Sequence, residues 1–119
     1  MRVMVFVKAT EPSEAEVMPT QDAFDAMGRF NDELEAAGVF VMADGLRPSR
    51  DGVRVGFDGD ARTVEPGPFT PAHELVAGFW IWEVASMAEA IEWAKRCPNP
   101  MPVPSKLEIR PFYGPLDIG

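Results

Sequence analysis

The sequence is poor in the residues that disulfides and metal sites require. It contains one cysteine, Cys97, and one histidine, His73. A single cysteine excludes a disulfide within the chain and fits a reducing compartment. One histidine and one distant cysteine cannot form a zinc or copper site without several carboxylates. No dinucleotide-binding glycine motif and no P-loop motif occurs either. The sequence therefore predicts no metal and no cofactor.

Basic residues and long apolar runs are also scarce. The chain has 11 Lys and Arg against 19 Asp and Glu, which gives a net charge of −8. This balance argues against nucleic-acid binding through a basic surface. The apolar run at the start is broken by Lys8, is too short to span a membrane and lacks a signal-peptide cleavage pattern. We expect a cytoplasmic protein with neither a membrane nor a nucleic-acid partner.

What remains is the composition of one small globular domain. Apolar residues make up 46% of the chain and charged residues 25%, an ordinary balance. We find no internal repeat, low-complexity tract or linker, and a chain of 119 residues suits one modest core. The expectation is a single domain over residues 1–119.

Hydrophobic periodicity predicts four main strands and two helices. Alternating patterns place the strands at 3–8, 39–46, 79–84 and 106–112, and amphipathic patterns place the helices at 20–37 and 86–97. Residues 53–65 alternate around Asp58-Gly59, which predicts a hairpin insert. Residues 10–18 are acidic and contain a proline, and are expected to form a loop. Without the hairpin the order is βαββαβ, the ferredoxin-like plan of an α+β protein.

Two helices can cover only one face of such a sheet. The strand at 79–84 is largely apolar on both faces, so both faces need a cover. We expect a homodimer, in which a second copy covers an apolar face carrying Phe40, Met42, Trp80, Trp82 and Phe112.

The most distinctive pattern of the chain lies between residues 65 and 84. Prolines on both sides of Gly67 exclude helix and central strand, because proline fixes φ and lacks an N–H, and an aromatic strand follows. The motifs are, in order, Gly67-Pro68-Phe69, His73-Glu74-Leu75, Gly78-Phe79-Trp80 and Ala90-Ile91-Glu92-Trp93-Ala94. In order and spacing they resemble the YCII-related family, in the branch with a DGPF motif, from Met1 to about Phe112.

This resemblance implies a dimeric α+β barrel with two sheets face to face. Family members are often encoded near extracytoplasmic-function (ECF) sigma factors, which implies a regulatory or interaction partner as an alternative to an enzyme. They are also often labelled dehydrogenases, which nothing in this sequence supports. The chain departs from the pattern at the aspartate of DGPF, which is Pro66 here, and His73 stands where lysine is usual. Either the aspartate carries acid–base chemistry that this chain lacks, or it only holds a turn that Pro66 stiffens instead.

His73 and Asp44 are the candidate catalytic residues, because histidine is the natural acid–base group near neutral pH. Structural alternatives stay open: Asp44 could cap the turn at Gly45, and His73 and Arg54 could simply face water. Three classes compete, namely a small-molecule enzyme, a binding module without chemistry and an interaction partner. The candidate ligand-binding residues around an aromatic cavity are Arg54, Glu65, Phe69, Glu74, Trp80, Trp82, Arg110 and Phe112.

Overall fold

The structure is a computed structural model that describes residues 1–114. In chain order its elements are β1 (Arg2–Lys8), α1 (Glu11–Glu14), α2 (Gln21–Ala36), β2 (Phe40–Gly45), η1 (Ser49–Asp51), β3 (Val53–Asp58), β4 (Ala61–Pro66), η2 (Ala72–Glu74), β5 (Val76–Glu83), α3 (Met87–Arg96) and β6 (Leu107–Pro111), where η marks a short 3-10 helix.

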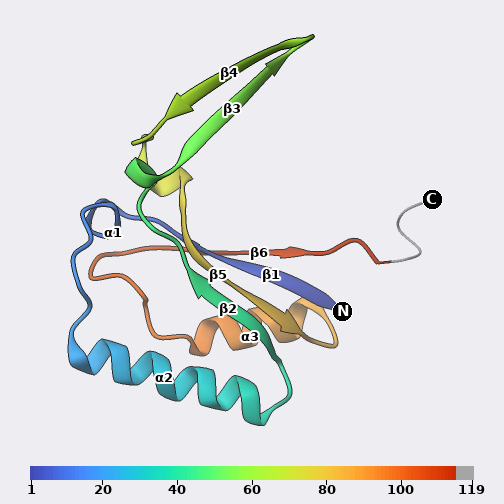
Figure 1. The fold of residues 1–119 in the computed structure, drawn as a ribbon. Coiled ribbons are helices and arrows are strands. Elements are labelled where there is room, and N and C mark those ends of the chain that lie inside the picture. Colours follow the sequence, from blue (N-terminus) through green and yellow to red (C-terminus); the bar gives the residue numbers. More distant parts are fainter. Residues whose placement is uncertain (115–119) are drawn as a thin grey trace.

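Four strands form an antiparallel sheet in the order β2-β5-β1-β6, and β3 pairs with β4 in a separate two-stranded sheet. The helices α2 and α3 lie on one face of the four-stranded sheet (Figure 1). The architecture is therefore α+β with antiparallel sheets, compatible with the ferredoxin-like plan expected from the element order.

Capping residues set the ends of both long helices. The Thr20 side chain accepts a hydrogen bond from the Ala23 N–H at the start of α2, and Gly38 follows the helix with φ at +72°. The Ser86 hydroxyl likewise accepts from the Glu89 N–H at the start of α3. These residues satisfy backbone groups that the first helical turn leaves unpaired.

The residues 10–18, expected to form a loop, contain a short helix, so that part of the expectation is wrong. Thr10 and Ser13 form a reciprocal cap at the start of α1. Pro12 does not prevent the helix, because it sits in the first turn, where the missing N–H has no intrahelical partner.

The core lies between the sheet and its two helices. Trp80 and Trp82 of β5 are buried in it, with 4% and 0% of their surface exposed, and each ring meets Phe30 of α2 edge-on. The Trp80 indole donates a hydrogen bond of 2.9 Å to the Asn31 side chain. The two tryptophans therefore face the helices. Phe40 of β2, which is paired with Trp82 in the sheet, also packs against this core.

The expectation that these three aromatic residues lie on the uncovered face of the sheet is wrong. Both faces of β5 are apolar, so alternation showed that two faces exist but not which one the helices cover. The face beneath the helices is the one with the two tryptophans, and the sequence pattern did not distinguish this face from the other.

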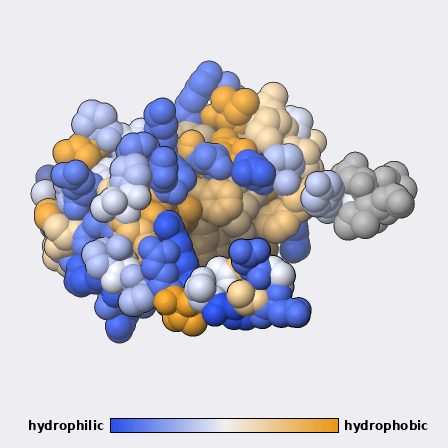
Figure 2. Space-filling view, turned by 90° about the horizontal axis from the view of Figure 1, so that it is seen from above, coloured by the Kyte–Doolittle hydropathy of each residue, from blue (hydrophilic) through white to orange (hydrophobic). Residues whose placement is uncertain are grey.

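We call the opposite side of the sheet the open face. Its positions follow from the strand register, in which Met42 is paired with Ile81, Phe79 with Phe6 and Ile81 with Met4. None of these side chains is buried. Seen from this side, apolar surface gathers in a hollowed area between polar side chains (Figure 2). Met42 and Phe112 are both 46% exposed. For these two residues, the expectation that they lie on a face not covered by the helices agrees with the structure.

The hairpin of β3 and β4 projects from one end of the sheet, on the side away from the helices (Figure 1). Its turn consists of Gly59 and Asp60, directly after the predicted Asp58, which is paired with Ala61, and Gly59 has φ at +59°. Every residue of both strands is exposed. We call this hairpin the arm.

Candidate functional site

The loop after the arm carries the family-like motif, and residues distant in sequence hold it. The Ser49 hydroxyl accepts a hydrogen bond of 2.9 Å from the Phe69 N–H. That hydroxyl also donates to the Glu14 carboxylate, which accepts the Ser49 N–H at 2.7 Å as well. A Cβ on Gly67 would lie 1.8 Å from the Ser49 carbonyl oxygen, so only glycine fits there. Glu14 thus holds Ser49, and Ser49 in turn holds the motif loop.

The register of the arm decides where the replaced motif aspartate would lie. Pro66 is paired with Val53, whereas Glu65 is paired with Arg54. Adjacent residues of a strand point to opposite faces, so Glu65 does not occupy the place of the residue at 66.

Arg54 is exposed, as the solvent-facing alternative expects, and it contacts Phe69 rather than Asp44. Its guanidinium lies 3.8 Å from the centre of the Phe69 ring. A cation over an aromatic face is attracted by about 0.5–1 kcal/mol at an exposed site. Arg54 and Phe69, both predicted to bind ligand, are therefore in contact at the base of the arm.

A cleft of about 970 Å³ opens at the end of β1, beside η2 and the start of β6. His73 of η2 lies in it together with Lys8 at the end of β1 and Lys106 just before β6. Its apolar wall includes Ala9, Pro71, Ala72, Val103, Leu107 and Ile109, and its carboxylates are Glu11 and Glu108. A largely apolar cleft of this volume with a few charged groups is typical of small-molecule sites.

Local contacts position two sides of the cleft. The Lys8 ammonium donates a hydrogen bond of 3.2 Å to the Glu74 carbonyl, which ties the end of β1 to η2. The Lys8 N–H donates to the Lys106 carbonyl, which ties it to the start of β6. The side chain of His73 is exposed.

Asp44 does not line this cleft. It is paired with Phe79 in the sheet, and its carboxylate accepts a hydrogen bond of 3.0 Å from the Gly45 N–H. The structural alternative for Asp44, a local cap of the turn at Gly45, is therefore present. Glu74 contributes its backbone carbonyl to the Lys8 contact, while its side chain is exposed.

Arg110 and Phe112 lie at the other end of the sheet, in a second hollow of about 1160 Å³ that also contains Arg2 and Ile81. Arg110 is paired with Met4, four residues before Lys8, so at about 3.3 Å per residue it lies roughly 13 Å along the strand from the His73 cleft. The structure thus separates these two residues from His73.

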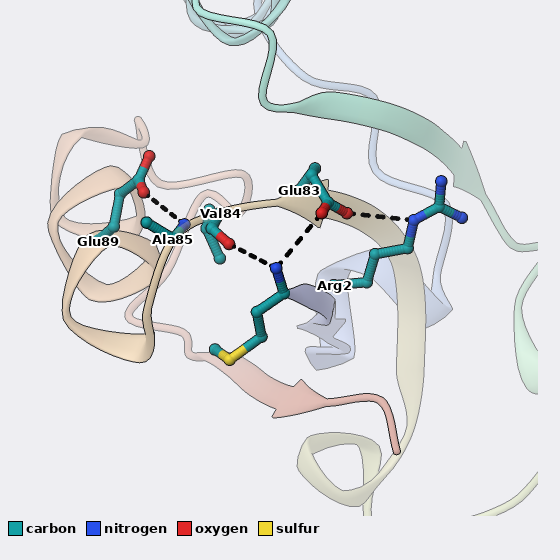
Figure 3. A network of polar contacts seen from close by, with 6 residues as sticks. Arg2, Glu83, Val84, Ala85 and Glu89 are labelled. Atoms are coloured by element: carbon teal, nitrogen blue, oxygen red, sulfur yellow. Dashed lines mark hydrogen bonds and ion pairs between the residues drawn. The ribbon is translucent and has the colours of Figure 1, made fainter. Parts of the chain in front are cut away.

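Most cations of the second hollow have carboxylate partners. Arg2 Nε donates to Glu83 at 3.2 Å, and the Met1 amino group donates to Glu83 at 3.3 Å and to the Val84 carbonyl at 2.8 Å (Figure 3). The hydrogen bond from the amino group is the main reason that the pKa of Glu83 is lowered. Arg110 lies 3.5 Å from Glu108. These positive charges are therefore already engaged by carboxylates and are less available to an anionic ligand than those of the His73 cleft.

Trp80 and Trp82 cannot line either hollow, because both are enclosed in the core. The expected aromatic cavity is therefore wrong for these two residues. The sequence did not predict Lys8, Lys106, Glu11 and Glu108 as residues of the cleft. It did not predict the hydrogen bonds between Glu14 and Ser49 either. The only available signal was the break that Lys8 makes in an apolar strand, since strand pairing alone brings these segments together.

Among residues 1–114, no three His, Cys, Asp or Glu side chains are grouped as a metal ion would require. In the same part of the chain, no helix combines the length and apolar character of a membrane span.

The fold and the motif loop define a class of small α+β domains, and comparison with known proteins gives the family. The YCII-related domain matches residues 1–112, so the chain belongs to the YCII-related family, as its motifs predicted. No curated protein matches the chain.

One similar solved structure is 5-chloro-2-hydroxyhydroquinone dehydrochlorinase from Burkholderia phenoliruptrix, in complex with 2,5-dihydroxybenzoquinone. It is 16% identical, with a TM-score of 0.51, and the match covers 96% of each chain. At this identity the likeness concerns the fold.

Proposed function

We propose that the protein is a homodimer that binds a small anionic molecule in the His73 cleft, with His73 as the proton-exchanging residue. The observation that carries this proposal is the cleft itself. It gathers the chain's one histidine and two lysines beside an apolar wall, in a volume that suits a small molecule. In this proposal Lys8, Lys106 and His73 are the groups of the cleft that hold an anionic group, because charge-assisted hydrogen bonds are the stronger ones.

Acid–base chemistry in the His73 cleft does not depend on the motif aspartate, whose position is occupied by Pro66 in this chain. Histidine is the side chain whose ordinary pKa lies closest to neutral pH, so it can both accept and donate a proton there. Asp44 lies outside the cleft and is dropped from the catalytic pair.

The dimer part of the proposal rests on uncovered surface. The chain exposes 8220 Å², whereas a compact monomer of this mass exposes about 6,400 Å². The five residues beyond Gly114 can account for at most about 800 Å² of the difference. More than about 1,000 Å² per chain remains, which is what a subunit of a stable homodimer buries. In the proposed barrel, two open faces meet across the two-fold axis.

The probe for the cleft is 2,5-dihydroxybenzoquinone, the compound bound by the structural neighbour. Its two acidic hydroxyl groups make it an anion at neutral pH. In calorimetric titration we expect His73→Ala and Lys106→Ala each to weaken binding about tenfold or more, because each removes a charge-assisted hydrogen bond.

Arg29→Ala is the control, since it removes an exposed cation of α2, a helix that contributes no residue to the cleft, and affinity should stay within about twofold. Equal affinity in all variants would move the site away from this cleft. No heat of binding at millimolar probe would remove this ligand class and favour the alternative, a non-enzymatic partner of an ECF-type sigma factor system.

A further inference from the structure

The arm has one apolar and one polar face. In its register Val53 faces Pro66 and Val55 faces Val64, whereas Arg54 faces Glu65 and Gly56 faces Thr63. Cross-strand partners lie on the same face. Valine and proline pairs therefore form one face of the arm, with the pair of Phe57 and Arg62 beyond them, and mostly polar residues form the other.

Within residues 1–114, the Arg62 guanidinium lies over the Phe57 ring, 4.6 Å from its centre, and the valines of this face remain open to solvent. The exposed fractions are 58% for Val53, 48% for Val55, 73% for Phe57 and 70% for Val64. A two-stranded hairpin is marginally stable in water without a further layer. A contiguous exposed apolar patch usually marks a protein interface.

The position of the arm relates it to the open face. The arm rises on the side of the sheet away from the helices (Figure 1), so any layer that covers the open face lies beside it. Each arm strand has six residues, a length of about 20 Å, whereas packed sheets lie about 10 Å apart. The arm is thus long enough to pass the sheet of a partner placed on the open face.

We propose that the apolar face of the arm packs against a second copy of this chain, so that two arms clasp the dimer from opposite sides. This inference rests on the homodimer of the proposed function and assigns a specific surface to it. A two-fold axis makes the contact reciprocal, since each copy gives one arm and receives another.

The amount of uncovered surface favours a second copy over an unrelated partner. The surface in excess of a compact monomer is more than about 1,000 Å² per chain, which is the area that a subunit of a stable homodimer buries, and the exposed strands of the arm are part of it. The open face and the arm lie on the same side of the chain. A second copy related by one two-fold axis can therefore cover both surfaces.

The test uses adjacent residues on opposite faces of β4. Val64→Lys places a charge on the apolar face, and Thr63→Lys places the same charge on the polar face. Sedimentation equilibrium gives the dimer dissociation constant of each full-length variant, and circular dichroism checks its fold. Both positions are exposed, so both variants should fold. We expect Val64→Lys to raise the dissociation constant about 100-fold and Thr63→Lys to change it less than about threefold, because only the first charge would be buried.

The outcomes separate this inference from the proposed function. A stable wild-type dimer that Val64→Lys leaves unchanged contradicts the arm contact and leaves the homodimer standing. Equal weakening by both variants contradicts the assignment to the apolar face. A wild-type monomer at micromolar concentration contradicts the arm contact together with the dimer, whereas the ligand titration still tests the cleft.

Discussion

At the scale of single residues, burial decides what the chain's one cysteine can do. Cys97 ends α3 and packs against the core. Burial raises the pKa of its thiol to about 12. The thiolate is the reactive form, so the native residue is held in the unreactive state. Cys97 thus serves as a small apolar residue packed against the core.

Cys97 should therefore react slowly with a thiol reagent in the folded protein. At pH 8 we expect labelling by a disulfide reagent to be at least about 100-fold slower in the native state than in guanidinium, because a thiol pKa about three units above the ordinary value leaves about a thousandth of the thiolate. The measurement is the rate of colour release with and without denaturant. Equal rates would show that Cys97 is accessible and ionised in the native protein.

At the scale of elements, the motif loop depends on contacts that its own sequence does not contain. Ser49 lies 20 positions before Phe69 and Glu14 lies 35 positions before Ser49, yet the three are linked by hydrogen bonds. The glycine of the motif is required by the Ser49 backbone rather than by a positive φ, since Gly67 is not among the residues with that conformation. The loop is thus a packed element between α1 and the arm.

Gly67→Ala tests this packing. We expect the free energy of unfolding to fall by about 1–3 kcal/mol, because the new Cβ meets a backbone oxygen that cannot move aside freely. Denaturant unfolding followed by circular dichroism measures the change.

Gly28→Ala is the matched control, because a Cβ at Gly28 meets nothing within 4 Å. That change should stabilise α2 by up to about 1 kcal/mol. A Gly67→Ala protein as stable as the wild type would show that the loop is not packed against Ser49 in solution.

At the scale of the whole molecule, the sheet has one covered and one uncovered side. Ile81 and Trp82 are neighbours on β5, but Trp82 is fully buried beneath the helices while Ile81 belongs to the open face. The asymmetry is the physical reason to expect association, because the uncovered side is apolar.

Ile81→Lys should yield a folded monomer. A charge at the centre of the proposed interface would be buried without a partner, which costs more than the association gains. Size-exclusion chromatography with light scattering gives the mass, and circular dichroism gives the fold. Glu92→Lys on the exposed side of α3 should leave the dimer intact. A folded Ile81→Lys dimer would place the interface elsewhere.

The sequence by itself determined the order of the main strands and of the two long helices, the caps of these helices and the family. These depend on local patterns, such as threonine and serine before the helices, the Asp58-Gly59 turn and the motif after Gly67. The separation of Glu65 from the motif aspartate also followed from the sequence, since neighbouring residues of a strand always point to opposite faces.

Only the tertiary structure decided which face of β5 lies beneath the helices and which residues surround His73. Both faces of β5 are apolar, so alternation alone could not assign Trp80 and Trp82 to the core. Lys8, His73 and Lys106 are far apart in the chain and meet because β1 pairs with both β5 and β6. Strand pairing is a contact between distant segments, and the energy that selects it comes from burial of the whole core, which no local pattern contains.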